Sequence, residues 1–355
     1  MIRPLPFLAL VGLLIGIVGY FASYVPPGNP FGGSFEDISV DLIAAPTSTV
    51  AALKIRHASS MPPVDIALFG DSRILPVSAH DVGYPSCRFF NFALSGESIR
   101  SSVALMEHLA AIGKAPRLAI VGIDNFESQY FSNPTWLPPM KRWQSAWTDL
   151  AVGWQRQDVS MTNWLRMGWR HLHTSGESVR YMFARQFLIS GANLWLDTAM
   201  PTGNGHEAKS HQRPHYRIDG SLSYGVAGKD GQADIPLPSA PEQIIVGYLR
   251  HDLQRLARQE RDGRRVIIYE SPVAPTSTRR FAQQPSAYAK FHRETFLEEC
   301  RKLGLACQAD PGLFAPDAGW RDSSHPPPGP LGAYIQTLIS EAVSGDRESV
   351  CNNDL

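Results

Sequence analysis

Apolar and polar residues alternate in short runs from residue 64 onward, and these runs predict strands and helices in turn. The runs typical of buried strands are residues 64–69, 87–94, 117–123, 264–273 and 305–310. Apolar residues recur with helical periodicity in residues 98–113, 241–263, 288–304 and 329–345. Strands rich in Val, Ile and Leu with helices between them indicate a parallel sheet covered on both faces. The predicted fold is therefore α/β, with three layers in the order α/β/α.

The amino-terminal pattern is different. Residues 5–25 are apolar with no polar face, Arg3 is the only charged residue before Glu36, and Pro26 stops a helix. The run has about the 20 residues that a helix needs to cross a bilayer. We expect residues 1–25 to be an uncleaved transmembrane anchor, with a cleaved signal peptide as the alternative. Arg3 favours a cytoplasmic amino terminus and an exported, periplasmic or extracytoplasmic bulk.

The segment that follows the anchor lacks the strand–helix rhythm. Residues 26–62 are rich in Pro, Gly, Ser and Thr, with one short helical pattern near residues 49–57. Such a composition predicts a stalk or linker between the membrane and the α/β domain, which we place at residues 63–345.

A second segment, residues 130–241, also breaks the rhythm and holds seven of the eight tryptophans. We interpret it as an insertion that caps the carboxyl edge of the sheet, with Tyr216 and Asp219 near the cleft. The tryptophans either pack the insertion's own core or contact substrate or the membrane surface. Residues 346–355 are expected to be a flexible tail.

Composition excludes some partners and leaves the cysteines open. Lys plus Arg and Asp plus Glu are equal at 33 each, with no block of like charge, which argues against a nucleic-acid partner. The four cysteines are Cys87, Cys300, Cys307 and Cys351. An oxidising compartment would permit disulfides, for which Cys300 with Cys307 is a conceivable pair, and ordinary buried thiols are the alternative. No CxxC pair, phosphate loop or dinucleotide fingerprint is present, so neither metal nor cofactor is expected.

Candidate chemistry begins directly after the first strand. Gly70-Asp71-Ser72-Arg73 stands where open α/β sheets display reactive groups. A serine nucleophile needs a base, and the base needs a third group to hold it. Of the eleven histidines only His325 follows an aspartate, Asp322, by three residues, directly before the last helix. We predict Ser72 as nucleophile, His325 as base and Asp322 as orienting acid; each motif alone is more often a turn or a solvated loop.

A serine mechanism also needs donors for the negative oxygen of a tetrahedral intermediate. The backbone N–H of Ser72, at an expected helix start, is one, and Gly96 after the second strand is another unless it forms a plain turn. Asn125 after the third strand is the side-chain donor, with an Asx-turn or loop cap as its alternative. Asp124 cannot donate while ionised. Arg73 either binds an anionic substrate group or pairs with a carboxylate.

Four segments resemble the SGNH, or GDSL-like, hydrolase superfamily: "FGDSR", "FALSGES", "VGIDNFE" and "DSSH". The resemblance spans about residues 64–130 and 242–340. The third segment of that superfamily usually reads Gly-x-Asn-Asp, whereas here Asp124 precedes Asn125. The similarity implies a flavodoxin-like three-layer fold and ester chemistry through an acyl-serine. Among exported, anchored members, the chain is similar to the D-alanyl transfer and alginate acetylation proteins, which handle acyl groups on cell-envelope polymers.

The resulting expectation is a membrane-anchored serine esterase or O-acyltransferase that acts on an acylated cell-envelope polysaccharide or another O-acyl ester. Hydrolysis and transfer remain open at this point, as does partnership with a multi-pass acyltransferase. The alternative is a catalytically silent SGNH-like module that binds glycan or docks on such an acyltransferase.

Overall fold

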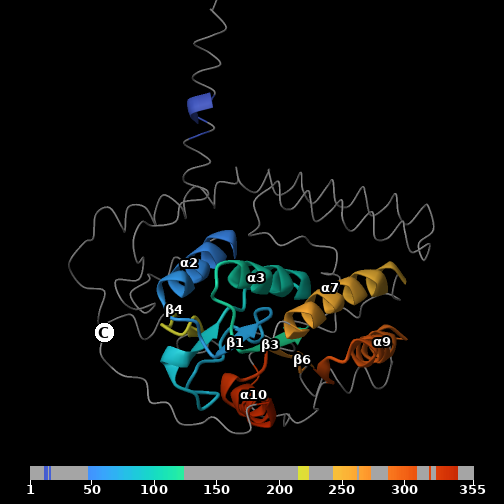
Figure 1. Cartoon of the computed structure of the whole chain (residues 1–355). Coiled ribbons are helices and arrows are strands. Elements are labelled where there is room, and N and C mark those ends of the chain that lie inside the picture. The colour runs from blue at the N-terminus through green and yellow to red at the C-terminus, as the bar shows by residue number, and fades with distance from the viewer. Residues whose placement is uncertain are drawn as a thin grey trace, which may run out of the picture.

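The computed structural model describes residues 12–14, 16, 47–123, 215–223, 243–261, 264–272, 287–309, 320 and 325–342. Its centre is a five-stranded sheet in the order β2-β1-β3-β6-β7, in which every neighbouring pair is parallel (Figure 1). The strands are β1 (Ile66–Phe69), β2 (Phe89–Asn91), β3 (Leu118–Ile123), β6 (Arg265–Glu270) and β7 (Ala306–Gln308).

Strands β1, β2, β3 and β6 are buried because their sequences are mostly apolar on both faces, whereas β7, at the edge of the sheet, is largely exposed. Every residue of β1, β2 and β3 is buried, and so is every residue of β6 after Arg265. A strand that alternated polar and apolar residues would leave one face in water, whereas these runs need cover on both sides.

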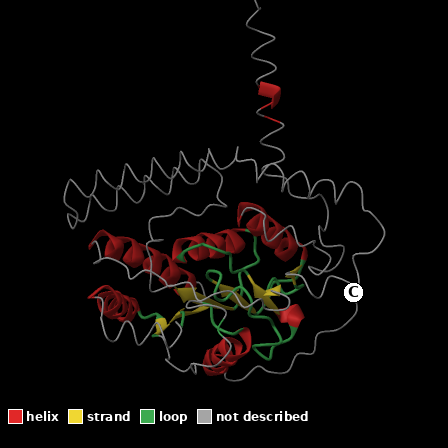
Figure 2. Cartoon of the chain, turned by 180° about the vertical axis from the view of Figure 1, so that it is seen from behind, coloured by secondary structure: helices red, strands yellow, loops and turns green. Residues whose placement is uncertain are grey.

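The helices supply that cover. They are α2 (Thr47–Ser60), α3 (Ile99–Ala111), α7 (Gln243–Arg261), α9 (Ala287–Leu303) and α10 (Pro328–Ala342), with a 3₁₀ turn η3 (Ser86–Arg88) before β2. Figures 1 and 2 show α2, α3 and α7 over one face of the sheet and α10 on the opposite face. The predicted α/β class with a parallel sheet is confirmed.

The helix α2 differs from the stalk predicted for residues 26–62. Its residues Val50, Ala51 and Leu53 belong to the same buried core as the sheet. Two polar residues of this helix, Lys54 and His57, are also buried, which interrupts the apolar pattern that would have announced a core helix. Residues 47–60 are therefore part of the folded domain.

A small hairpin covers the β2 edge of the sheet. It is formed by β4 (His215–Tyr216) and β5 (Leu222–Ser223), which pair antiparallel within the range predicted as an insertion. The backbone N–H of Asn91 donates to the carbonyl of Asp219 at 2.7 Å, which joins the hairpin to β2. Tyr216 and Asp219 are buried in this contact instead of facing a cleft. The remainder of the predicted insertion, residues 130–214 and 224–241, lies outside the described residues, as does the predicted tail.

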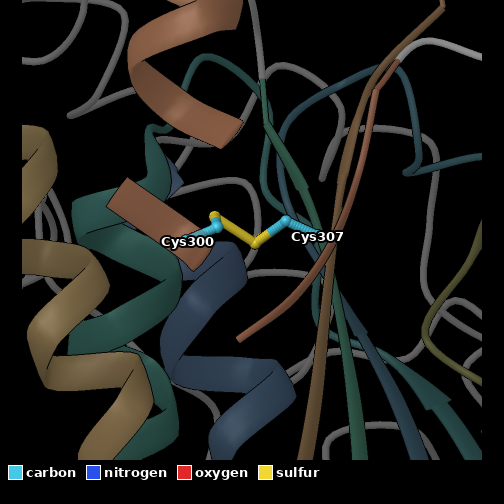
Figure 3. The surroundings of a disulfide bond; sticks show 2 residues. All are labelled: Cys300 and Cys307. Atoms are coloured by element: carbon cyan, nitrogen blue, oxygen red, sulfur yellow. A yellow bond between two sulfur atoms is a disulfide. The ribbon is translucent and has the colours of Figure 1, made fainter. Parts of the chain in front are cut away.

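A disulfide links α9 to β7, the strand at the other edge of the sheet. Cys300 near the end of α9 is bonded to Cys307 in β7 (Figure 3), so of the two alternatives for this pair the structure contains the disulfide. Cys87 is disulfide-bonded as well, whereas Cys351 lies outside the described residues. Gly304, between α9 and β7, has a φ of 72°, the left-handed conformation in which glycine commonly ends a helix.

Within the described part of the chain, no helix has the length and apolar character needed to cross a bilayer. Of the predicted anchor, residues 1–25, the structure describes residues 12–14 and 16.

Candidate active site

The turn that presents Ser72 forms directly after β1. The carboxylate of Asp71 accepts the backbone N–H of Arg73 at 2.9 Å, a side-chain-closed turn that aspartate forms readily. Ser72, at the middle of this turn, is partly exposed. Residues 72–76 continue as turns. The helix start expected at Ser72 is therefore wrong: the carbonyls of Ile74 and Leu75, which a continuing helix would use, accept bonds from Asn91 and Leu222 instead.

Glycine is required at position 70. Its φ is 149°, and a Cβ atom there would lie 2.9 Å from the carbonyl oxygen of Gly122 in β3. Only a residue without a side chain allows the ends of β1 and β3 to approach this closely. The chain consequently leaves β1 at a defined place and direction, with Ser72 two residues on.

His325 lies beside Ser72 although the two are 253 positions apart. Its Nε2 atom is 2.8 Å from the Ser72 Oγ, and both side chains are only partly buried. This is the distance at which an imidazole takes the proton of a hydroxyl nucleophile.

The segment after Ser72 packs on α10, the helix that begins just after His325. A Cβ atom at Gly332 would lie 2.5 Å from the Cβ of Asp81, so the helix and this segment are in direct contact. Tyr269 of β6 packs edge-to-face on Tyr334 of α10, with ring centroids 5.8 Å apart. These two contacts hold α10, and with it His325, against the strand end that carries the serine.

Tyr269 is a buried neighbour of the site that sequence reasoning did not single out. A Cβ atom at Gly122 would lie 3.0 Å from its hydroxyl oxygen. Burial, reinforced by the negative charge of Asp71, raises the pKa of Tyr269 well above its ordinary value of 10.0. The phenol is therefore neutral at neutral pH.

The side chain of Arg73 is buried, whereas an arginine that binds substrate would need to reach the solvent. Its side chain is 5% exposed, and its Nε atom is 3.9 Å from the carboxylate of Asp71. Of the two roles predicted for Arg73, pairing with a carboxylate is the one that the structure contains.

Gly96 lies at the same edge of the sheet as Ser72. The N–H of Leu94 donates to the carbonyl of Gly70 at 3.0 Å, so the chain leaves β1 and β2 side by side. Gly96 is exposed, has a φ of 70°, and has no atom of the described residues within 4 Å of where a Cβ would stand. Within the described part of the chain, its backbone is therefore open to a ligand from the solvent side.

The other predicted site residues, Asp124, Asn125 and Asp322, lie outside the described residues, so their roles stay predictions. Among the residues that are described, no cluster of His, Cys, Asp and Glu side chains has the arrangement of a metal site.

Sequence reasoning also missed a buried polar network beside the site. It contains Lys54, Asn91 and Asp219, all at most 4% exposed. One signal was available: Asn91 interrupts the apolar run "FFNFAL", where a polar side chain must find partners inside the protein.

Comparison with known proteins does not assign the chain to a family. No family model matches it, and a search of the curated proteins finds no significant match.

Proposed function

We propose that the chain is a serine esterase or O-acyltransferase of the SGNH type. Ser72 attacks the carbonyl carbon of an ester while His325 takes the hydroxyl proton. His325 then protonates the departing alkoxide, which leaves an acyl-serine. Water or a sugar hydroxyl attacks that intermediate and frees the serine. The observation that supports this function is the 2.8 Å between the Ser72 Oγ and the His325 Nε2.

The surroundings of this pair support the same chemistry. The backbone N–H groups of Ser72 and Gly96 are the donors proposed for the oxyanion, and the open space at Gly96 leaves room for it. Asn125 is the proposed side-chain donor, and Asp322 is proposed to hold the imidazole of His325 in the reactive tautomer.

The proposed setting is the cell envelope, with the domain on the outer side of a membrane. The apolar run of residues 5–25 and the Cys300–Cys307 disulfide support it, because disulfides persist in oxidising compartments. An acylated envelope polysaccharide is the proposed substrate, on the resemblance of "FGDSR", "FALSGES" and "DSSH" to proteins that handle such acyl groups.

The deciding experiment compares Ser72→Ala with wild type in two assays. One is release of p-nitrophenol from its acetate ester, and the other is covalent labelling by a fluorophosphonate. Ser72→Ala should lower kcat at least about a thousandfold and abolish labelling, because no nucleophile remains. The control is Ser59→Ala, which removes an exposed hydroxyl bonded only within α2 and should change neither assay. Turnover and labelling that survive in Ser72→Ala would exclude the mechanism.

The inverted order of Asp124 and Asn125 favours a second candidate, a catalytically silent module that binds acylated glycan. This candidate predicts that wild type is neither labelled nor able to cleave the ester, yet still binds an acetylated polysaccharide. The same labelling experiment therefore separates the two candidates.

A further inference from the structure

One buried side chain joins the two segments that flank the candidate site. The amide nitrogen of Asn91 donates to the carbonyls of Ile74, Leu75 and Val77, at 2.9, 3.2 and 2.8 Å. Its oxygen accepts the N–H of Ala93 at 2.9 Å. The first three partners follow Ser72 along the chain, and Ala93 leads to Gly96. A fully satisfied amide of this kind fixes both segments at once.

Lys54 of α2 holds the same strand end from the other side. Its amine donates to the carbonyls of Asn91 at 2.9 Å and Ala93 at 2.7 Å. The side chain is fully buried, and its nitrogen is 5.2 Å from the centre of the Tyr216 ring. Burial lowers the pKa of this amine well below its ordinary value, opposed by the charge of Asp219. Two N–H groups are present in either protonation state, so both carbonyls keep a donor.

The hairpin completes this arrangement. Asp219 accepts the N–H of Ala79 at 2.6 Å, and Leu222 donates its N–H to the carbonyl of Leu75 at 2.9 Å. The backbone of the segment after Ser72 is therefore held by Asn91 of β2 and by the hairpin, and the segment also packs against α10. The segment that leads to Gly96 is held by Lys54 and Asn91, and by backbone bonds from Phe92 to Leu68 and from Leu94 to Gly70.

We propose that Lys54 and Asn91 are positioning residues, which set the distance between the Gly96 backbone and the Ser72 hydroxyl. This inference rests on the proposed function, in which Gly96 donates to the oxyanion. A displacement of about 1 Å in a catalytic group lowers a rate by roughly a hundredfold. Hydrogen bonds that fix the backbone at Ala93 therefore affect the rate of the chemical step.

The test is Lys54→Met, which keeps length and volume but removes both donors. We expect kcat for p-nitrophenyl acetate and the rate of fluorophosphonate labelling to fall together, by about ten- to a hundredfold, since both need the oxyanion donors. KM should stay within about twofold and the pH midpoint of kcat should not move, because Ser72 and His325 still meet. The matched control is Lys114→Met, which removes a lysine bonded to the carbonyl of Met61. Met61 precedes β1, so this bond lies at the amino ends of the strands, opposite the carboxyl ends where Ser72 lies. This variant should leave kcat unchanged.

Three outcomes overturn the proposal. A lower thermal midpoint with normal kcat would make Lys54 purely structural, and a rise in KM alone would make it a substrate-binding residue. An equal loss of kcat in Lys114→Met would show that the effect is not specific to Lys54. If Lys54→Met does not fold, Asn91→Ala is the second variant: it removes the donors to the three carbonyls without placing a charge among them. At a temperature where this variant is fully folded, it should lower kcat and leave KM unchanged.

Hydrogen exchange separates this proposal from the proposed function. In a Ser72→Ala background, Lys54→Met should accelerate amide exchange in residues 92–97 and leave residues 118–123 protected. If wild type proves inert toward esters, the proposed function fails, and exchange alone decides whether Lys54 holds this segment. Unchanged exchange at residues 92–97 would overturn the positioning role whatever the activity.

Discussion

Gly70 is the residue on which the direction of the serine turn depends most. Its φ of 149° lies in a region that side chains rarely adopt, and the carbonyl oxygen of Gly122 occupies the space a Cβ would need. Gly113 also has a positive φ, 72°, but nothing lies within 4 Å of its missing Cβ. A comparison of substitutions at Gly113 and Gly70 therefore distinguishes the cost of a positive φ alone from the added cost of a steric clash.

Gly113→Ala should lower the free energy of unfolding by about 1 kcal/mol, the usual cost of a strained φ. Gly70→Ala should cost about 2–3 kcal/mol, because it adds a clash with backbone that cannot move aside. It should also slow labelling of Ser72, which Gly113→Ala should leave unchanged. Urea unfolding and fluorophosphonate kinetics measure the two effects. Equal destabilisation with normal labelling in both variants would show that the turn tolerates a side chain.

The proximity of Ser72 and His325 could be predicted from the sequence, because each lies in a short motif at a predicted strand end or before a predicted helix. The roles of Lys54 and Asn91 could not be. Their partners are backbone carbonyls 14 to 39 positions away, and every residue has a carbonyl, so no residue type marks the pairing. Buried polar side chains of this kind become meaningful only once the fold is known.

Where the apolar pattern is long and regular, the sequence predicted the helix or strand to within about two residues of its ends. The run 241–263 became α7, Gln243–Arg261, and 117–123 became β3, Leu118–Ile123. The hairpin of β4 and β5 was not predicted, since two residues a strand are too few to show alternation. The sequence predicts a helix start at Ser72 where the structure has a turn, because the partners that compete for the carbonyls of this segment, Asn91 and Leu222, are distant in sequence.

Packing between α7 and α9 includes a two-bond ion pair. Arg250 contacts Glu299 through Nε at 2.6 Å and through a terminal nitrogen at 2.8 Å. These bonds, more than the other nearby charges, lower the pKa of Glu299 below its ordinary value of 4.5. A lowered carboxyl pKa stabilises the folded state above about pH 4.5, and this contribution is lost as the pH falls through the folded-state pKa.

Glu299→Gln should therefore lower the free energy of unfolding by about 1–2 kcal/mol at pH 7. The difference from wild type should shrink as the pH is lowered from 5 to 3, because the unfolded-state carboxyl binds protons more readily than the folded one and so favours unfolding. Urea unfolding at several pH values measures it. Its neighbour Glu298, exposed and paired with exposed Lys302, is the control, and Glu298→Gln should cost less than about 0.5 kcal/mol. A difference that persists undiminished at pH 3 would contradict this role.

The chain's stability as a whole should depend on the redox state of its surroundings. The Cys300–Cys307 disulfide closes a short loop between α9 and the edge strand β7 (Figure 3). A loop of this length is expected to contribute about 2–3 kcal/mol by restricting the unfolded chain.

The paired substitution Cys300→Ala and Cys307→Ala should lower the thermal midpoint by several degrees. It should also remove the part of the midpoint's response to dithiothreitol that comes from reducing this disulfide. Turnover of p-nitrophenyl acetate by the folded fraction should not change, since β3 and β6 lie between β7 and the strand that ends at Ser72. Thermal unfolding with and without reductant, alongside the esterase assay, measures both. Loss of turnover at full folding would show that the β7 edge reaches the site.

Strands β3 and β6 are neighbours in the sheet, yet residues 124–264 separate them along the polypeptide. Synthesis runs from the amino end, so the half bearing Ser72 emerges long before the half bearing His325, and closing so large a loop is slow. A nascent chain that has reached only α7 holds an alcohol without its imidazole. On the proposed mechanism such a chain is chemically inert until α10 docks and brings His325 to Ser72.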